Sequence, residues 1–119
     1  MPSLIKLKKD LDSAEEIQLS VVGRKSGHMI PRPVWFVRDE DKLLLLPGSG
    51  SKSQWYKNAS KHPKVEISTH GDTYQLGIRL TSSPDEVKLI VDKFREKYGA
   101  GDVKRYYENF DAAAEMTLA

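Results

Sequence analysis

Apolar and polar residues alternate along several short segments of the chain. In Glu16–Val22 the apolar residues fall mainly at every second position, and the same period returns in Val65–Thr69 and Thr73–Leu80. This period is typical of a β-strand with one buried face, because successive side chains of a strand point to opposite sides. The tripeptide His70-Gly71-Asp72 favours a tight turn, so we predict that the last two segments form a β-hairpin.

Met29–Val37 is predicted to form one further strand after a glycine-bounded turn. Strand alternation places Arg32 and Trp35 on opposite faces of it. Pro31 and Pro33 lie two residues apart, so their missing N–H groups are directed to the same side of the strand. Because a ladder hydrogen bond needs those groups, this strand is expected at an unpaired edge of a sheet or at an opening in a barrel.

Two other segments complete the predicted strands. Leu43–Leu46 is uniformly apolar, which is typical of a central strand covered on both faces. A weaker alternation over residues 112–118 predicts a short closing strand. The charged stretch at residues 38–42 is predicted as an exposed hairpin turn, and not as a pair of catalytic carboxylates.

Helical signals are concentrated in the second half of the chain. A helix is predicted over Pro84–Tyr98, because Ser83 is a favourable N-cap residue and apolar residues then recur at helical spacing. Gln54–Lys61 is predicted as a short helix with a serine at its N-cap, and Asp102–Phe110 as another. Residues 1–15 are compatible with a short amphipathic helix or with a loose arm.

The order of these elements predicts a mainly β fold with inserted helices. About six short antiparallel strands favour a split β-barrel, since closing the sheet removes exposed strand edges. The 119 residues fit one domain, 1–119, which is long enough to bury a single hydrophobic core.

Composition excludes several classes of function. Cysteine is absent, which excludes disulfides, thiolate zinc sites and cysteine nucleophiles. His28, His62 and His70 lack metal-ligand spacing, so no metal site is expected. A net charge of +2 is too small to indicate a nucleic-acid partner. The longest apolar run, Leu43–Pro47, is too short for a signal peptide or a membrane span, and a cytoplasmic protein is expected.

Basic residues are concentrated around a tight turn at Gly23–Gly27. Arg24, Lys25 and Ser26 place two cations and a hydroxyl group inside this turn, and Arg32 follows in the next strand. Glycine adopts positive φ at little cost, so the turn can curl and present backbone N–H groups to an anion. The pattern favours a phosphate site, although a solvated basic hairpin turn fits these residues equally well.

A second donor-rich loop lies at Gly48–Ser53, directly before the predicted Gln54–Lys61 helix. A helix N-terminus favours anions through its free N–H groups and its dipole. Lys52 adds a full charge, but the spacing is not that of a Walker P-loop, and a flexible linker is the commoner meaning of such a composition. The two loops together lead to the hypothesis of a single phosphate clamp.

Aromatic residues supply the remaining candidates. Trp55 is predicted as a core anchor or, alternatively, as a wall beside a bound ring system. Asn58 is one helical turn further on, where its amide can brace a loop. Tyr106 and Tyr107 can present a phenol to a substrate, although such tyrosines more often pack with the hydroxyl group in water.

Four segments carry a resemblance to a known family. Gly23–Gly27, Pro33–Val37, the Trp-Tyr-Lys-Asn sequence at 55–58 and His62–Val65 occur in the order seen in the deazaflavin-dependent nitroreductase family. That family belongs to the split-barrel flavin-binding group that also contains pyridoxamine-phosphate oxidases. The resemblance implies a homodimer with cofactor sites at the interface. It implies coenzyme F-420, a deazaflavin, as the cofactor, or FMN as in related branches.

The resemblance also implies a reaction and a set of binding residues. The reaction is hydride transfer from the reduced ring to an electron-poor acceptor, such as a quinone, an activated alkene or a nitro compound. Alternatives are an FMN-dependent oxidoreductase, a cofactor carrier without turnover, and a binding domain for phosphorylated ligands or single-stranded nucleic acid. The implied cofactor-binding residues are Arg24, Lys25, Ser26, Arg32, Gly48, Ser49, Gly50, Ser51, Lys52, Trp55 and Asn58.

Overall fold

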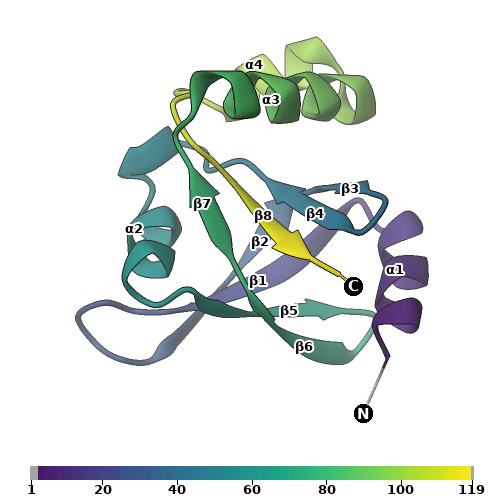
Figure 1. The fold of residues 1–119 in the computed structure, drawn as a ribbon, viewed down its shortest axis with the longest axis vertical. Helices are drawn as coiled ribbons and strands as arrows, with labels where there is room; N and C mark the ends of the chain where they lie inside the picture. The colour runs from purple at the N-terminus through teal and green to yellow at the C-terminus, as the bar shows by residue number, and fades with distance from the viewer. Residues whose placement is uncertain (1–2, 119) are drawn as a thin grey trace.

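The computed structural model describes residues 3–118. Within them, eight strands form two four-stranded antiparallel sheets, with orders β2-β1-β5-β6 and β3-β4-β8-β7 (Figure 1). The mainly β fold predicted from the sequence is confirmed. The strands are β1 (Glu16–Val22), β2 (Met29–Trp35), β3 (Val37–Asp39), β4 (Lys42–Leu45), β5 (Lys64–Thr69), β6 (Asp72–Gly77), β7 (Arg79–Thr81) and β8 (Ala113–Thr117).

The helices are α1 (Leu4–Asp12), α2 (Gln54–Lys61), α3 (Pro84–Tyr98) and α4 (Ala100–Tyr106), and a short 3₁₀ turn η1 (Gly50–Lys52) precedes α2. Of the predicted N-terminal segment 1–15, residues 1 and 2 lie outside the described residues, and Leu4–Asp12 is a helix and not a loose arm. Its N-cap Ser3 accepts a hydrogen bond from the Lys6 amide. The helix predicted over Asp102–Phe110 ends earlier, because the Glu108 amide donates to the Gly48 carbonyl oxygen instead of continuing the helix.

Two predicted strands break where the chain passes from one sheet to the other. The segment Met29–Val37 divides at Phe36 into β2 and β3, and Thr73–Leu80 divides at Ile78 into β6 and β7. Both residues at the breaks are buried apolar side chains. The apolar pattern therefore runs through each crossing without a break, although the hydrogen-bonded partner strands change there.

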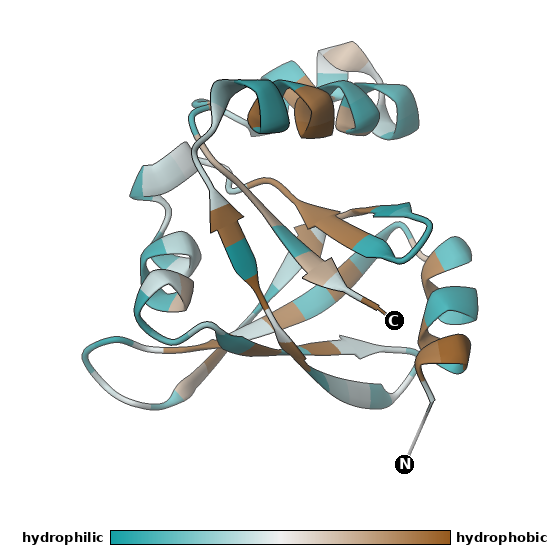
Figure 2. Cartoon of the chain, viewed as in Figure 1, coloured by the Kyte–Doolittle hydropathy of each residue, from teal (hydrophilic) through white to brown (hydrophobic). Residues whose placement is uncertain are grey.

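The hydrophobic residues form two clusters on the two faces of β4. Leu43 and Leu45 belong to the cluster that also contains residues of β1, β5 and β8. Leu44 and Leu46 belong to the cluster formed with α3 and α4. The predicted central strand, covered on both faces, is confirmed. Figure 2 shows hydrophobic residues gathered in β4 and recurring along α3.

The strand β2 lies at the edge of its sheet, as its two prolines predict. It pairs with β1 in the register Pro31 opposite Ser20 and Pro33 opposite Gln18. Met29 and Ile30 on this strand are 41% and 42% exposed. The open edge of β2 is thus an apolar surface. Among the residues described, no helix is long and apolar enough to cross a membrane.

Candidate functional site

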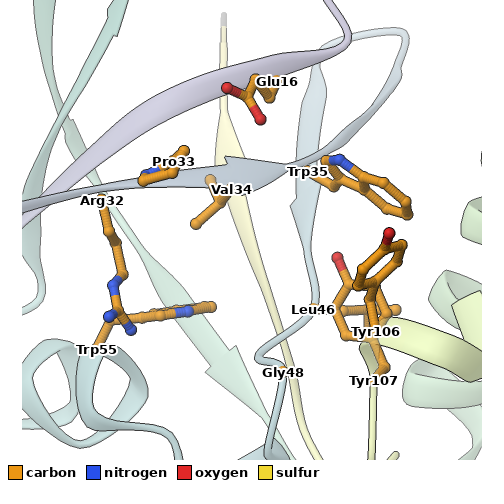
Figure 3. A pocket seen from close by; sticks show the side chains of 10 residues that line it. All are labelled: Glu16, Arg32, Pro33, Val34, Trp35, Leu46, Gly48, Trp55, Tyr106 and Tyr107. Atoms are coloured by element: carbon orange, nitrogen blue, oxygen red, sulfur yellow. The ribbon is translucent and has the colours of Figure 1, made fainter.

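A cleft of about 540 Å³ opens where the end of β2 meets the start of α2 and the end of α4. Figure 3 shows two sides to it: Arg32 and Trp55 lie together on one side, and Trp35 lies with Tyr106 and Tyr107 on the other. The volume is in the range of small-molecule and cofactor sites, about 300–1,000 Å³. The lining residues are Glu16, Arg32, Pro33, Val34, Trp35, Leu46, Gly48, Trp55, Tyr106 and Tyr107.

The cationic side of the cleft consists of Arg32 and the indole of Trp55. Arg32 extends from the exposed edge strand β2 toward Trp55 (Figure 3). Trp55 is 4% exposed and packs into the cluster between the sheets while it lines the cleft. Trp55 is therefore a core residue, as predicted, and its position in the cleft lining also allows the predicted alternative role beside a bound ring. The rigid indole fixes the surface beside which the Arg32 guanidinium lies.

The aromatic side of the cleft is built on Trp35. Its indole stacks on the ring of Tyr98 with centroids 4.2 Å apart and planes at 8°, and meets Tyr106 edge-on at 5.2 Å. Offset stacks and edge contacts of this kind are the favoured aromatic geometries. Tyr107 is buried, and burial raises the pKa of its phenol, so it stays protonated at ordinary pH.

The Gly23–Gly27 turn is fastened to α2 by Arg24. The Arg24 amide and guanidinium donate to Asn58 Oδ1 at 3.1 and 2.8 Å, and the guanidinium also donates to Gln54 Oε1 at 2.9 Å. Asn58 is buried, and its side chain braces this turn. Arg24 thus donates to neutral amide oxygens, and these bonds bring no negative charge to balance its positive charge.

The rest of this turn depends on a close approach at Gly23. A Cβ there would lie 2.6 Å from Ser26 Oγ, so the absence of a side chain lets Ser26 fold back over the turn. Ser26 Oγ accepts a hydrogen bond from the His28 amide at 3.2 Å, and Gly27 has a φ of +75°. Lys25 is exposed and lies outside the cleft lining. The result is a tight, well-defined basic turn.

The Gly48–Ser53 loop uses its donors within the protein. Ser51 donates from its amide to Asp111 Oδ1 at 2.8 Å and from its hydroxyl group to Asp111 Oδ2 at 2.6 Å. The Ser49 amide donates to Ser53 Oγ, so Ser53 occupies the N-cap position of α2 without capping it through its side chain. This loop is a fixed scaffold and not a flexible linker.

Asp111 and Gly50 make this loop possible. Gly50 has a φ of +60°, and a Cβ there would lie 2.1 Å from Asp111 Oδ1 and 2.9 Å from the Asn109 carbonyl oxygen. The hydrogen bonds from Ser51 lower the pKa of Asp111, so its carboxylate stays charged. The Asp111 carboxylate of the protein itself therefore accepts the two hydrogen bonds from Ser51 that the sequence analysis assigned to a bound phosphate.

The structure brings some of the predicted site residues together and separates others. Arg32, Gly48 and Trp55 line the cleft, and Arg24 with Asn58 joins the first turn to α2. The other predicted residues lie outside the cleft lining: Lys25, Ser26, Ser49, Gly50, Ser51 and Lys52.

Trp35 is the main residue that sequence reasoning missed. Alternation along one continuous strand placed Trp35 and Arg32 on opposite faces, yet both line the cleft. The reason is that the cleft reaches both faces of the edge strand β2 at this end, because the four consecutive residues 32–35 all line it. Tyr106 and Tyr107 were considered as substrate-facing phenols, and both line the cleft.

The basic residues around the two loops and α2 form no ion pair with the residues that the structure describes: Arg24, Lys25, Arg32, Lys52, Lys57, Lys61 and Lys64. Several cations elsewhere on the surface do form ion pairs, as Arg79 does with Glu86 and Glu115. Lys9 and Lys88, which also lie elsewhere, form none with the described residues. Clustered, unpaired cations beside a cleft attract an anionic ligand.

Comparison with protein families gives a match over nearly the whole chain. A family described as "Uncharacterized protein conserved in bacteria (DUF2255)" matches residues 7–118. The chain belongs to this family. The matched residues include the strands of both sheets and the residues that line the cleft.

Solved structures with the same fold carry several different descriptions. An F420-H2 dependent reductase, FDR-A, is 15% identical with a TM-score of 0.65, over 86% of this chain and 93% of that chain. A putative pyridoxamine 5′-phosphate oxidase from Listeria innocua is 12% identical with a TM-score of 0.70, over 96% and 91%. HutZ, a heme storage protein from Vibrio cholerae, is 14% identical with a TM-score of 0.72, over 98% and 89%. At such identities the likeness establishes the fold alone.

Proposed function

We propose that this protein binds a deazaflavin, coenzyme F-420, in the cleft and transfers hydride to an electron-poor acceptor such as a quinone, an activated alkene or a nitro compound. The observation that carries the proposal is the two-sided cleft: on one side an arginine that forms no ion pair with any residue described, and on the other flat aromatic rings. A cofactor with a phosphate and a planar tricyclic ring has the complementary chemistry. FMN shares both features and is the alternative cofactor.

The residues fit such a group in charge, shape and size. On the cationic side, Arg32 binds the phosphate, and Arg24 and Lys25 add positive charge from the turn that precedes β2, where Ser26 adds a hydroxyl group. Trp55 forms a wall there, and Gly48 presents backbone without a side chain. Ser49 to Lys52 continue the loop that contains Gly48, and the Gly48 carbonyl oxygen accepts from the Glu108 amide. The cofactor supplies the redox chemistry when bound, while the chain binds, orients and shields it from water.

The second side of the cleft receives the ring and the acceptor. Trp35 and Tyr106 offer flat surfaces, and Val34 and Leu46 make the intervening surface apolar. Such a surface favours planar, uncharged acceptors over charged ones. The reductase and the putative oxidase with this fold are in keeping with an oxidoreductase, and the heme storage protein with this fold keeps a carrier without turnover as the alternative.

The open edge of β2 supports a homodimer as the functional form. This strand contributes Arg32, Val34 and Trp35 to the cleft, and its exposed Met29 and Ile30 continue the same edge as an apolar surface. Exposed apolar side chains favour association with another chain, here through side-chain contacts because the two prolines hinder strand pairing. A second copy on this edge would place its own surface beside the cleft.

Direct titration tests the proposal. The purified protein is titrated with F-420 and with FMN, and the fluorescence of Trp35 and Trp55, which both line the cleft, reports binding. Saturable quenching by one cofactor is expected, and absence of saturable binding by either would overturn the proposal. Adding the reduced cofactor with a quinone or nitro acceptor then separates an enzyme from a carrier: a carrier shows binding but no acceptor-dependent oxidation.

A further inference from the structure

The crossing between the two sheets at Phe36 is held by the C-terminal end of α3. The Phe36 amide donates to the Tyr98 hydroxyl oxygen at 3.1 Å. That hydroxyl group lies 2.8 Å from the Phe36 carbonyl oxygen and 2.7 Å from the Glu15 carbonyl oxygen. Lys97 Nζ also donates to the Phe36 carbonyl oxygen, at 2.8 Å.

The Tyr98 hydroxyl group joins the segment before β1 to the crossing. A tyrosine has one O–H to donate, so the hydroxyl group donates to the carbonyl oxygen of Glu15 or of Phe36 while it accepts from the Phe36 amide. Burial raises the pKa of Tyr98 to about 12, so this arrangement persists across the ordinary pH range.

The same tyrosine supports Trp35 through its ring. Its phenol ring stacks on the Trp35 indole with centroids 4.2 Å apart and planes at 8°, and Phe94 packs against the phenol ring at 5.9 Å. Tyr98 itself is not part of the cleft lining, whereas Trp35 is. The hydroxyl group thus fixes the phenol ring, and the phenol ring fixes the indole.

We propose that Tyr98 is a positioning residue that holds the Trp35 indole as the flat wall against which the bound ring packs. Trp35 is the last residue of β2, directly before the chain passes into β3. Because β2 is an edge strand, it has a neighbouring strand, β1, on one side only. If the Trp35 indole is already held in place before binding, the complex does not lose the entropy of ordering this side chain. The inference rests on the proposed function.

Two substitutions separate the two contributions of Tyr98. Tyr98→Phe keeps the stacked ring and removes the hydroxyl group, whereas Tyr98→Leu removes both. Val87→Ala is the control, because it removes buried volume from the same helix, far from its C-terminal end. Acrylamide quenching of Trp35 is measured in a Trp55→Phe background, in which Trp35 is the remaining tryptophan.

The binding probe for the same variants, with Trp55 intact, is the ring portion without phosphate. This is 8-hydroxy-5-deazariboflavin if the wild type binds F-420 and riboflavin if it binds FMN. We expect Tyr98→Leu to raise acrylamide quenching about twofold and to weaken ring binding about three- to tenfold. Tyr98→Phe gives a smaller change in the same direction, and Val87→Ala changes neither readout.

The outcomes are distinguishable. Unchanged quenching of Trp35 in Tyr98→Leu overturns the support that we assign to Tyr98. If the wild type binds the ring and Tyr98→Leu binds it with the same affinity, the proposed effect of Tyr98 on the binding site is overturned. If the wild type binds neither cofactor, the proposed function fails, and the quenching experiment still decides whether Tyr98 positions Trp35.

Discussion

Two glycine-bounded loops meet α2 and use their polar groups in opposite ways. In the Gly23–Gly27 turn, Lys25 is exposed and forms no ion pair with the acidic residues that the structure describes. In the Gly48–Ser53 loop, both donors of Ser51 are bonded to the carboxylate of Asp111. The exposed Lys25 of the first turn therefore remains free of the acidic residues described, although Arg24 in the same turn donates to Asn58 and Gln54. Ser51 of the second loop, by contrast, donates to Asp111.

The difference lies in a partner that is distant in the sequence. Asp111 is 60 residues from Ser51, and it approaches the loop because the chain after α4 runs back past Gly48. Backbone donors in a folded protein are nearly always satisfied, either internally or by a ligand. The composition of a loop shows that it has hydrogen-bond donors. Only the tertiary structure shows whether a protein group accepts those hydrogen bonds or leaves the donors free for a ligand.

The largest expected effect is on cofactor binding by the turn and β2. Replacing both Lys25 and Arg32 by alanine should weaken binding by about 2–4 kcal/mol, because each charge-assisted contact contributes about 1.5–3 kcal/mol. Arg32→Ala should account for most of it, since Arg32 lines the cleft and Lys25 does not. Fluorescence titration measures the change.

The matched control removes the same charge elsewhere. Lys9 and Lys88 are also lysines without an ion-pair partner among the residues described, and they lie outside the cleft lining. Alanine at both should leave binding unchanged. Titration curves of the Lys25 and Arg32 double variant that coincide with those of the wild type would remove the phosphate assignment.

The next effect concerns the stability of the Gly48–Ser53 loop. Gly50→Ala should lower the free energy of unfolding by about 2–3 kcal/mol, through a positive φ and a collision with Asp111. Gly71→Ala is the control, because its φ is +83° and no atom lies within 4 Å of its added Cβ. It should cost only about 1 kcal/mol. Equal losses in urea unfolding would contradict the close packing at Gly50.

A smaller effect is expected from removing the carboxylate itself. Asp111→Ala should lower the free energy of unfolding by about 1 kcal/mol, because two hydrogen bonds from Ser51 are lost at an exposed site. Asp111→Asn keeps one acceptor oxygen and should lose about half as much. If both variants unfold at the wild-type urea concentration, the carboxylate does not hold this loop.

The same carboxylate predicts a pH dependence of stability. Hydrogen bonding lowers the pKa of Asp111 in the folded protein below its ordinary value of 3.8. The group therefore stabilises the fold above about pH 4, and this contribution is lost as the pH falls through the folded pKa. The difference in unfolding free energy between the wild type and Asp111→Ala should shrink from about pH 6 to about pH 3. A constant difference would contradict the assignment.

The smallest effect is expected at Lys52. Its charge acts on the nearby Asp111 carboxylate, so part of it is compensated within the protein. Lys52→Ala should weaken cofactor binding by less than about 0.5 kcal/mol, and Lys25→Ala by more. Equal losses for the two lysines would mean that both loops contribute alike, as composition alone suggested.

Much of the fold could be predicted from local patterns. The helices Gln54–Lys61 and Pro84–Tyr98 were predicted with their observed bounds, and the two prolines of β2 correctly predicted an edge strand. The crossings at Phe36 and Ile78 could not be predicted, because a buried apolar residue looks the same within a strand and between two sheets. The predicted end of α4 was wrong, because the amide of Glu108 donates to the Gly48 carbonyl oxygen.

The candidate site was less predictable than the fold. Arg32 and Trp55 were selected for charge and ring shape, and both line the cleft. Trp35 was missed because the cleft reaches both faces of β2 and because Trp35 stacks with the distant Tyr98. Asp111 was missed because nothing near it in the sequence indicates a partner for Ser51. Residues that are placed by tertiary contacts leave no local signal.

The most direct test of the account compares each cofactor with its phosphate-free counterpart. Binding of FMN and riboflavin, and of F-420 and its deazariboflavin, is measured for the wild type and for Arg32→Ala. The account predicts that the wild type prefers the phosphorylated form at least about tenfold and that Arg32→Ala removes most of this preference. A preference of equal size in the two proteins would contradict the claim that the Arg32 side of the cleft binds the phosphate.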